Sequence, residues 1–356
     1  MITVSIVNVT SYTGLELLRL LANHPEFVVT SVSARSSSGQ RLDTVFPQFS
    51  AGRNRTTHST SVGNLLISEK PEQTDLAFVC LPHAAAAETV VKLLAQNVKV
   101  IDLSADFRLR DAAIYEKWYQ HTHPAPALLE AAVYGLSERY RTRIAQSSLV
   151  ANPGCHSTTA ILALLPAISA GLIKPDIIVN TITGISGAGR SLKLSSLYCE
   201  QDEDSSAYGL DGHRHLPEIT QELEAAARES GHPLPDGLRL TFVPHVVPMS
   251  RGLLATCYAD LKESSLTIEE IRAVYAAYYV NEPCIRVLDT APHTKWTTGT
   301  NLCLIYPTLD QSTGRLMVVS CLDNLVKGAA GQALQNANLV AGLPETAGLP
   351  TVPLAP

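Results

Sequence analysis

The first third of the chain alternates short, continuous apolar runs with segments in which apolar residues recur at helical spacing. The apolar runs occupy residues 4–7, 27–32, 76–80 and 98–103, and the helical patterns occupy 15–23 and 84–96. A strand that is apolar along its whole length is buried on both faces, as in parallel sheets covered by helices. The pattern therefore predicts a doubly wound α/β domain with right-handed crossovers.

The pattern changes after residue 149. Helical patterns at 156–170 and 266–279 now accompany later apolar runs, several of which alternate apolar with polar residues, at 177–183, 238–243, 252–261, 301–306 and 316–322. Alternation is typical of strands with one buried and one open face. This part is predicted to be an α+β domain with a mixed sheet. An alanine-rich helix is expected at 323–340, followed by an aperiodic tail that carries four prolines.

Composition narrows the possible functions. The chain has 356 residues, 46% apolar and 17% charged, and its length accommodates about two domains of roughly 150 residues. This balance excludes intrinsic disorder, which needs low hydrophobicity and high net charge. The net charge of −6 excludes a broad basic surface for nucleic acid or anionic lipid. The low charge content also favours burial of apolar surface between subunits, in a homo-oligomer.

Neither targeting nor metal signals stand out. The N-terminal residues lack the basic region of a secretory signal, and the longest apolar stretch, 159–173, contains Pro166 and is too short to span a bilayer. The seven cysteines are widely spaced without a CxxC pair, so neither a disulfide framework nor a zinc site is predicted. We expect a cytoplasmic protein that does not contact a membrane.

The strongest chemical signal is Asn152-Pro-Gly-Cys155, a turn between a strand pattern ending at Ala151 and a helical pattern beginning at His156. Cys155 therefore falls beside the positive end of a helix, where the field favours a nucleophilic thiolate. A buried structural cysteine is the alternative. The other six cysteines lie in apolar strands or loops, so the nucleophile is favoured for Cys155.

A second dense cluster is Gly212-His213-Arg-His215-Leu-Pro-Glu218. A nucleophilic cysteine needs a proton-transfer partner near neutral pH, and histidine fits that role best. A polar surface turn and half of a metal site are the alternatives, and His-x-His alone is a weak metal signal. The sequence does not distinguish His213 from His215.

Two further segments can meet anions. The loop from Gly184 to Arg190 combines exposed backbone N–H groups with one cation, although glycines alone do not separate a ligand loop from a mobile one. Arg108 follows a predicted parallel strand, at the sheet edge where such folds bind ligands. It can bind a carboxylate or phosphate, or pair with Asp106 or Asp111.

The first strand-to-helix turn is a candidate pyrophosphate site. It carries only one of the glycines of a dinucleotide fingerprint, but it retains the position at a helix N-terminus; its residues are Thr10, Ser11, Tyr12, Thr13 and Gly14. The end of the second strand offers Arg35, Ser36 and Ser38 and lacks the acidic residue that would hold a ribose hydroxyl. This suits the 2′-phosphate of NADP, and an ordinary polar loop is the alternative.

Several motifs occur together in one order along nearly the whole chain to about Gly342. They are Tyr12-Thr-Gly14, Leu81-Pro-His83, Asp102-Leu-Ser-Ala-Asp-Phe-Arg108, Tyr134-Gly-Leu-Ser-Glu138, Asn152-Pro-Gly-Cys155, Gly184-Ile-Ser-Gly-Ala-Gly-Arg190, His213-Arg-His-Leu-Pro-Glu218, Pro244-His245 with Arg251-Gly252, and Asp323-Asn-Leu-Val-Lys-Gly328. In these motifs the chain resembles the N-acetyl-gamma-glutamyl-phosphate reductase family, the arginine-biosynthesis branch of the aspartate-semialdehyde dehydrogenase superfamily.

The resemblance implies an NADP-dependent reductase of an acyl phosphate that works through a cysteine thioester. It makes Cys155 the active-site cysteine and one of His213 and His215 its acid/base. The implied substrate ligands are Arg108, Arg190 and Glu218, and the implied cofactor contacts beyond the first turn and Arg35 are Leu81, Pro82, Ser186, Gly187 and Asn324.

The resemblance also implies the domain layout. Residues 1–151 form the Rossmann-type cofactor domain, completed by the helix at 323–342. Residues 152–322 form the catalytic and oligomerisation domain, in a dimer or tetramer, and 343–356 form a tail.

Two departures from the family pattern bear on function. Asn8 and Ser11 stand at two of the family's turn glycines, and His156-Ser157 stands where Tyr-Pro is common. Two alternatives therefore remain beside the main hypothesis. One is the sister reaction on a carrier-linked aminoadipyl phosphate in lysine biosynthesis, and the other is a non-catalytic Rossmann-type regulator.

Overall fold

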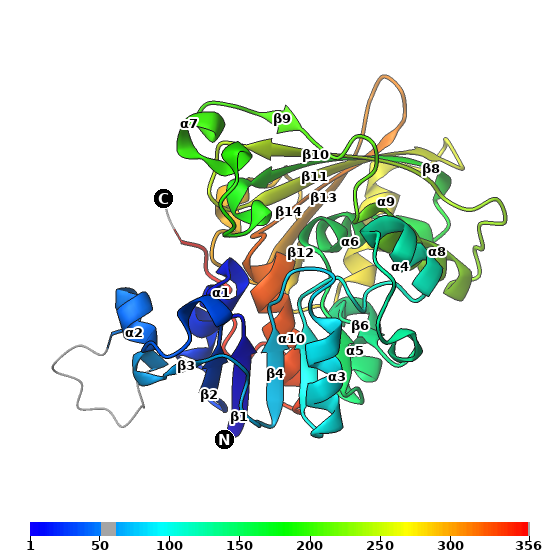
Figure 1. Cartoon of the computed structure of the whole chain (residues 1–356). Helices are drawn as coiled ribbons and strands as arrows, with labels where there is room; N and C mark the ends of the chain where they lie inside the picture. Colours follow the sequence, from blue (N-terminus) through cyan, green and yellow to red (C-terminus); the bar gives the residue numbers. More distant parts are fainter. Residues whose placement is uncertain (51–61, 355–356) are drawn as a thin grey trace. The chain divides into compact units, whose positions relative to one another are not determined.

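The computed structural model describes residues 1–50 and 62–354. They form two compact units, each with its own sheet (Figure 1). Unit 1 comprises Met1–Pro153 and Ala329–Leu349, and unit 2 comprises Gly154–Gly328 and the segment from Pro350. Unit 1 thus includes residues 152–153 and the first part of the expected tail, whereas residues 323–328 lie in unit 2.

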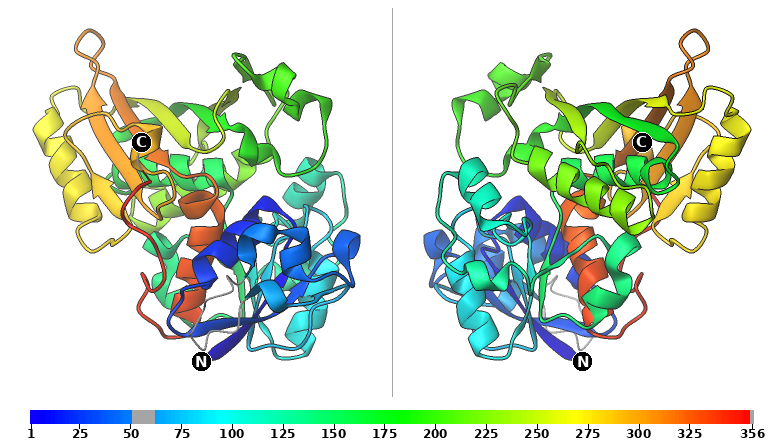
Figure 2. Two further views of the ribbon diagram at one scale, coloured as in Figure 1. Left: turned by 90° about the vertical axis from the view of Figure 1, so that its left-hand side faces the viewer. Right: turned by 90° about the vertical axis from the view of Figure 1, so that its right-hand side faces the viewer.

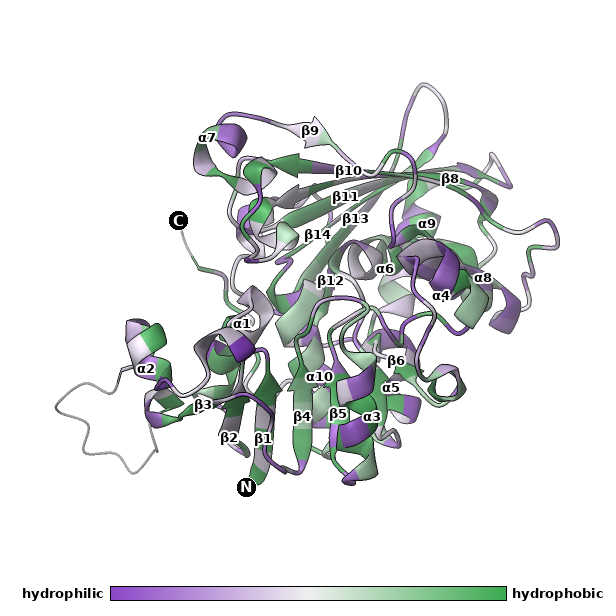
Figure 3. Ribbon diagram, viewed as in Figure 1, coloured by the Kyte–Doolittle hydropathy of each residue, from purple (hydrophilic) through white to green (hydrophobic). Residues whose placement is uncertain are grey.

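Unit 1 contains a seven-stranded sheet in the order β3-β2-β1-β4-β5-β7-β6, in which every pairing is parallel. The strands are β1 (Ile2–Val7), β2 (Phe27–Ser33), β3 (Ile67–Ser68), β4 (Leu76–Val79), β5 (Lys99–Asp102), β6 (Val133–Tyr134) and β7 (Leu149–Ala151). All four residues of β4 are buried, and β2 and β4 are predominantly apolar (Figure 3). Successive side chains point to opposite faces, so both faces are covered and the doubly wound prediction is confirmed.

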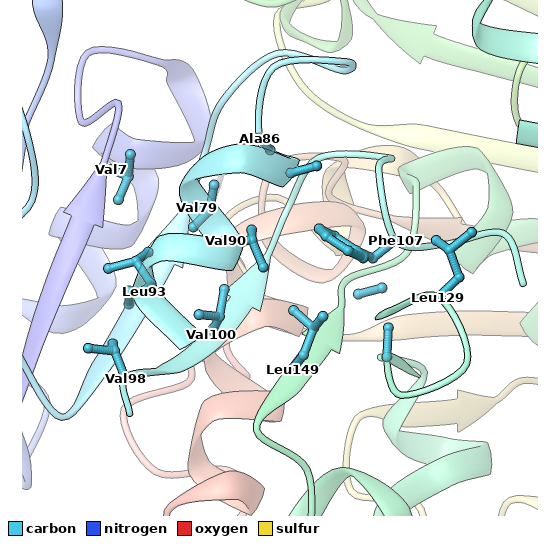
Figure 4. Packing of buried hydrophobic residues seen from close by; sticks show 14 residues of the cluster. Val7, Val79, Ala86, Val90, Leu93, Val98, Val100, Phe107, Leu129 and Leu149 are labelled. Carbon is cyan, nitrogen blue, oxygen red and sulfur yellow. The ribbon is translucent and has the colours of Figure 1, made fainter. Parts of the chain in front are cut away.

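The helices of unit 1 are α1 (Tyr12–Leu21), α2 (Leu42–Val45), α3 (Ala87–Ala95), α4 (Ala112–Tyr119), α5 (Ser137–Ala145) and α10 (Gly331–Val340). Val90 and Leu93 of α3 pack in a cluster with Val79 and Val100 of the sheet (Figure 4). Helices α2, α4 and α5 were not predicted. The sequence of α4, with four charged or tyrosine side chains in eight residues, has too weak an apolar period to indicate a helix.

The helix expected at 323–340 begins later and less regularly. The carboxylate of Asp323 accepts the N–H groups of Leu325 and Val326, a π-helical turn follows at Val326–Ala330, and regular α10 begins only at Gly331. An aspartate that bonds its own following N–H groups forms a local turn that competes with helix. The periodicity therefore predicted the α10 segment but placed its beginning too early.

Unit 2 contains a second seven-stranded sheet in the order β12-β13-β14-β11-β8-β10-β9. The strands are β8 (Ile173–Gly184), β9 (Ser206–Ala207), β10 (Arg239–Val247), β11 (Leu253–Leu261), β12 (Ile285–Val287), β13 (Cys303–Leu309) and β14 (Leu316–Leu322). The β8–β10 and β12–β13 pairs are parallel and the others antiparallel. In β11 fully buried residues alternate with more exposed ones, so the prediction of a mixed sheet with one open face is confirmed.

Helices α6 (Cys155–Ser169), α7 (Tyr198–Gln201), α8 (Leu216–Glu229) and α9 (Ile268–Tyr278) complete unit 2. Nearly every residue of α6 is buried, and it packs against β11, β14, α8 and α9. Figure 2 shows α9, in yellow, beside the orange strands of this sheet. Within the described residues, no helix combines the length and the hydropathy needed to cross a membrane.

Pro166 lies inside α6 and has no N–H, which deprives the carbonyl of Leu162 of its helical donor. Tyr279 replaces that donor, because its hydroxyl lies 2.5 Å from the Leu162 oxygen. The hydroxyl of Tyr275 donates to the neighbouring Ala163 carbonyl at 2.8 Å. Two tyrosines thus satisfy backbone oxygens in the buried helix that carries Cys155.

We expect Tyr279→Phe to lower the free energy of unfolding by about 1–2 kcal/mol, because a buried carbonyl loses its donor. In a Pro166→Ala background the restored N–H should reduce this loss. Urea denaturation of the four combinations measures the coupling, with Tyr278→Phe on the same helical turn as a control. Equal losses in both backgrounds would contradict the role of Tyr279.

Candidate active site

Cys155 is the first residue of α6 and is partly exposed, whereas five of the other six cysteines are buried. The N-cap residue, Gly154, has an extended backbone (φ −71°, ψ 149°). The first N–H groups of a helix have no partner within it, so the thiol lies beside the positive end of the helix dipole. The position can stabilise a thiolate and, later, an oxyanion.

A buried carboxylate fixes this helix start. Glu218, 1% exposed, accepts the Gly154 N–H at 2.8 Å. Glu218 belongs to the first turn of α8, for which His215 is the N-cap residue. The bond therefore joins the turn that carries Cys155 to the turn that carries the histidine motif.

Three imidazoles gather in this region. The ring centroids of His213 and His215 lie 4.8 Å apart, and the His156 ring lies 5.6 and 5.5 Å from them. Phe242 and Tyr208 pack against the cluster. The expected pair of histidines thus becomes a group of three.

These surroundings keep two of the rings neutral. Burial lowers the pKa of His213 to about 4, and the adjacent Arg214 charge adds to the effect. Burial lowers the pKa of His156 to about 3, with a smaller contribution from His213. The Nδ1 of His213 accepts the backbone N–H of His215 at 3.1 Å, so its proton lies on Nε2.

Gly328 lies directly against the cysteine. A Cβ added to this residue would be 2.8 Å from the Cys155 Cβ, closer than side chains approach one another. The absence of a side chain at residue 328 therefore leaves room for the cysteine. Around Cys155, as across the rest of the described chain, no three His, Cys, Asp or Glu side chains are grouped to hold a metal ion.

Three predicted cofactor contacts come together in unit 2. The Nδ2 of Asn324 donates to Ser186 Oγ at 2.9 Å, and its Oδ1 accepts the Gly252 N–H at 2.9 Å. Gly187 is adjacent, because an added Cβ would be 4.0 Å from Asn324 Nδ2. The amide of Asn324 thus holds the loop that follows β8, while Arg190 lies further along this loop and is exposed.

The first turn of unit 1 has a shape suited to a dinucleotide despite its missing glycines. Asn8 adopts the left-handed conformation (φ 61°) that a glycine would supply, and its amide donates to the Cys80 carbonyl. Ser11 caps α1 by accepting the Gly14 N–H. A Cβ at Gly14 would be 2.8 Å from three backbone atoms, so this glycine is required for the helix to approach the strand.

The remaining predicted cofactor residues follow β2 and β4. Arg35, Ser36 and Ser38 lie in an exposed segment after β2. Leu81 and Pro82 follow β4, in a loop held by the Asp106 carboxylate, which accepts the N–H groups of Ala84, Ala86 and Ala87. The N-terminus of α1, the Arg35 cation after β2 and the loop held by Asp106 after β4 are features with which parallel sheets bind dinucleotides.

Arg108 has a more structural environment than expected. Its side chain is 5% exposed, and its Nε and Nη2 donate to the carbonyls of Asn152 and Leu103 at 2.8 and 3.0 Å. Asn152 belongs to the turn that leads to Cys155. The contacts show that Arg108 braces this turn.

No role was predicted for His156 or Tyr208, yet both belong to the cluster next to Cys155. Their hydrogen bond, 2.9 Å between His156 Nε2 and Tyr208 Oη, joins α6 to the segment that follows β9. The departure from the family pattern at residue 156 was a signal for the first. An isolated tyrosine in a polar loop offered no signal for the second.

Comparisons with known proteins agree with this architecture. Residues 3–147 match the family model described as semialdehyde dehydrogenase, NAD binding domain, and residues 155–324 match semialdehyde dehydrogenase, dimerisation domain. The chain is 49% identical to an N-acetyl-gamma-glutamyl-phosphate reductase of Dehalococcoides mccartyi, over 99% of this chain and 98% of the relative. It is 47% identical to the protein of that name from Desulfotalea psychrophila, over the full length of both.

Solved structures show the same fold at low identity. Aspartate semialdehyde dehydrogenase II of Vibrio cholerae matches with a TM-score of 0.69 and 15% identity, over 96% of this chain and 98% of that one. The Candida albicans aspartate semialdehyde dehydrogenase, solved with NADP, matches with a TM-score of 0.66 and 15% identity, over 96% and 98%. The chain thus carries an NAD-binding domain and a dimerisation domain of this fold.

The neutral histidines predict acid sensitivity. Below the ordinary histidine pKa of 6.5, the unfolded chain takes up protons at His156 and His213 that the folded state excludes down to pH about 4 for His213 and about 3 for His156. Stability should therefore fall as the pH drops through this window, by about 1.4 kcal/mol per pH unit for each proton.

His213→Asn keeps an acceptor for the His215 N–H and removes the titration, so it should flatten this dependence in urea titrations between pH 6.5 and pH 4. Arg214, His215 and Tyr208 remain in place around the site. His121→Asn, at an exposed histidine, is the control. An unchanged slope in His213→Asn would show that His213 is protonated in the folded state.

Proposed function

This chain belongs to the N-acetyl-gamma-glutamyl-phosphate reductases of the semialdehyde dehydrogenase family, and on that premise we propose that it reduces N-acetyl-γ-glutamyl phosphate to N-acetylglutamate 5-semialdehyde and phosphate in arginine biosynthesis. The observation that carries the reaction class is the partly exposed Cys155 at the start of α6, beside a histidine cluster. The relatives' names support the choice of substrate.

In the proposed reaction the Cys155 thiolate attacks the acyl carbon of the substrate. The carbon–sulfur bond forms, the bond to the phosphate oxygen breaks, and phosphate leaves with the bonding electrons, which gives a thioester on Cys155. Backbone N–H groups of the first turn of α6 stabilise the negative charge that develops on the carbonyl oxygen. Glu218 contributes by fixing the Gly154 N–H and with it the orientation of this turn.

The two motif histidines take different parts. His213 is neutral, and its Nδ1 is engaged, so it can donate one hydrogen bond from Nε2 but is a poor acceptor of a second proton. We therefore assign the acid/base role to His215, at the N-cap of α8. In this role His215 protonates the alkoxide oxygen that hydride addition creates on the thioester carbon, and takes the proton back when the thiohemiacetal collapses to the aldehyde and the Cys155 thiolate.

NADP is the proposed cofactor. When bound in its reduced form it supplies the hydride that converts the thioester to a thiohemiacetal, whose collapse returns the thiolate to Cys155. In unit 1, Thr10–Gly14 would hold the pyrophosphate, Arg35 with Ser36 and Ser38 the 2′-phosphate, and Leu81 and Pro82 the adjoining ribose. The contacts proposed on unit 2 are Ser186, Gly187 and Asn324.

Substrate binding and assembly complete the proposal. Arg108 and Arg190 are the proposed ligands of substrate anions, although the buried Arg108 also braces the Asn152 turn. The open face of the unit 2 sheet supports a homo-oligomer, a dimer or tetramer, since it exposes apolar side chains such as Ile178. A cytoplasmic location is part of the same proposal.

The direct test is NADP reduction at 340 nm with N-acetylglutamate semialdehyde, with and without inorganic phosphate. We expect phosphate-dependent turnover, no turnover in Cys155→Ala, and retained NADP binding in that variant. Turnover in Cys155→Ala would rule out the thioester. Bound cofactor without turnover would favour the carrier-linked aminoadipyl substrate, and a chain that binds no cofactor would favour the regulator.

Arg35→Ala tests the choice of cofactor. Loss of one guanidinium contact to the 2′-phosphate should weaken NADPH binding about tenfold or more and leave NADH binding almost unchanged. Fluorescence titration with both dinucleotides measures the two affinities. Arg41→Ala, which removes an exposed arginine paired with Asp43, is the matched control. Equal weakening of NADPH and NADH would exclude Arg35 from this role.

A further inference from the structure

His156 directly follows the proposed nucleophile, yet the mechanism above does not use it. The side chain is 2% exposed, and each ring nitrogen has a hydroxyl partner. Nδ1 lies 2.8 Å from Thr181 Oγ1 of β8, and Nε2 lies 2.9 Å from Tyr208 Oη. The contacts form a continuous chain from the sheet, through α6, to the segment after β9.

The direction of these hydrogen bonds follows from the tautomer of His156. Burial holds His156 in its neutral form, with a pKa of about 3, so one nitrogen donates a hydrogen bond and the other accepts one. If Thr181 donates to Nδ1, then Nε2 carries the proton and donates to Tyr208 Oη. The phenolic hydrogen of Tyr208 is then available to another acceptor.

Tyr208 lies within electrostatic range of Cys155 and packs against the histidine cluster. Its ring centroid lies 5.5 Å from that of His213, and its backbone N–H is bonded to the Pro244 carbonyl. Burial and, secondarily, the charge of the nearby Cys155 thiolate raise the pKa of the phenol, so it remains protonated throughout the working pH range. A permanently protonated donor that can reach a thiolate stabilises negative charge without transferring its proton.

We propose that His156 is a positioning residue, which through Thr181 and its own Nε2–H orients the Tyr208 hydroxyl as a hydrogen-bond donor to the negative charge that develops at the Cys155 centre. The inference rests on the proposed function, because it takes Cys155 as the nucleophile. A His156 that only fills the core would affect stability alone. One that orients Tyr208 must affect the thiolate and the chemical step.

Two substitutions of His156 test its two ring nitrogens separately. The amide of glutamine reaches the position of a histidine Nε2, and the amide of asparagine reaches that of Nδ1. His156→Gln can therefore keep the bond to Tyr208, whereas His156→Asn keeps only the bond to Thr181. We expect His156→Asn to lower kcat about tenfold with an unchanged KM for the acyl phosphate, and His156→Gln to recover most of that loss.

Tyr208→Phe should lower kcat to the same extent, and its combination with His156→Asn should cause no additional loss, because both act through one hydroxyl. Additive losses would overturn the proposal, as would equal activity of the Asn and Gln variants. Tyr198→Phe, at a tyrosine that is 77% exposed, is the matched control.

Alkylation of the thiols provides a readout that does not need turnover. Mass spectrometry of iodoacetamide-treated protein gives separate rates for Cys155 and for the exposed Cys199, which serves as an internal control. In His156→Asn and Tyr208→Phe the alkylation profile of Cys155 should shift upward by about one pH unit, and that of Cys199 should not move.

The alkylation experiment distinguishes a failure of this inference from a failure of the proposed function. A shifted Cys155 profile in a chain without reductase activity would support the positioning role and reject only the substrate. An unshifted profile in a chain with normal wild-type turnover would reject the positioning role and leave the reductase intact. A shift of both cysteines together would indicate a general structural change and would also overturn the proposal.

Discussion

The hydrogen bond from the Gly154 N–H to the Glu218 carboxylate joins the first turns of α6 and α8, and the geometry of the proposed reactive centre depends on it. One of these turns carries Cys155, and His215 caps the other. Because Glu218 is almost fully buried, the bond is shielded from water and holds both turns in one arrangement.

Unit 1 uses a similar device for its ligand-binding edge. Asp106 gathers three N–H groups before α3, and Asn8 supplies the left-handed turn that a glycine usually provides. In both units a buried polar side chain, rather than the backbone alone, fixes the loop that would touch a ligand. The first turn therefore keeps its shape although two of its glycines are replaced. Gly14 remains where the helix comes closest to the backbone of the preceding strand and turn.

The sequence predicted the features that depend on the spacing of apolar residues and on short turn motifs. Both sheets, the helix at Cys155 and the pairing of His213 with His215 follow from apolar spacing and from motifs along the chain. Contacts between distant segments were not predictable in this way. The bond from Tyr208 to His156 spans 52 residues, and Arg108 bonds a carbonyl 44 residues away. Such contacts depend on tertiary packing. A polar loop or a lone tyrosine has no periodic pattern in the sequence from which the contact could be predicted.

The neutral histidines set a limit on how the cysteine can be activated. In many cysteine enzymes an imidazolium stabilises the thiolate as an ion pair. Here burial keeps His156 and His213 uncharged, so neither can supply that cation. For the nucleophile proposed above, a cation would have to come from another group such as His215, while the first N–H groups of α6 and the hydroxyl and imidazole donors around it supply fixed dipoles. Dipoles that are fixed by packing remain in place when the negative charge moves from sulfur to oxygen. An ion pair centred on sulfur would oppose that movement of charge.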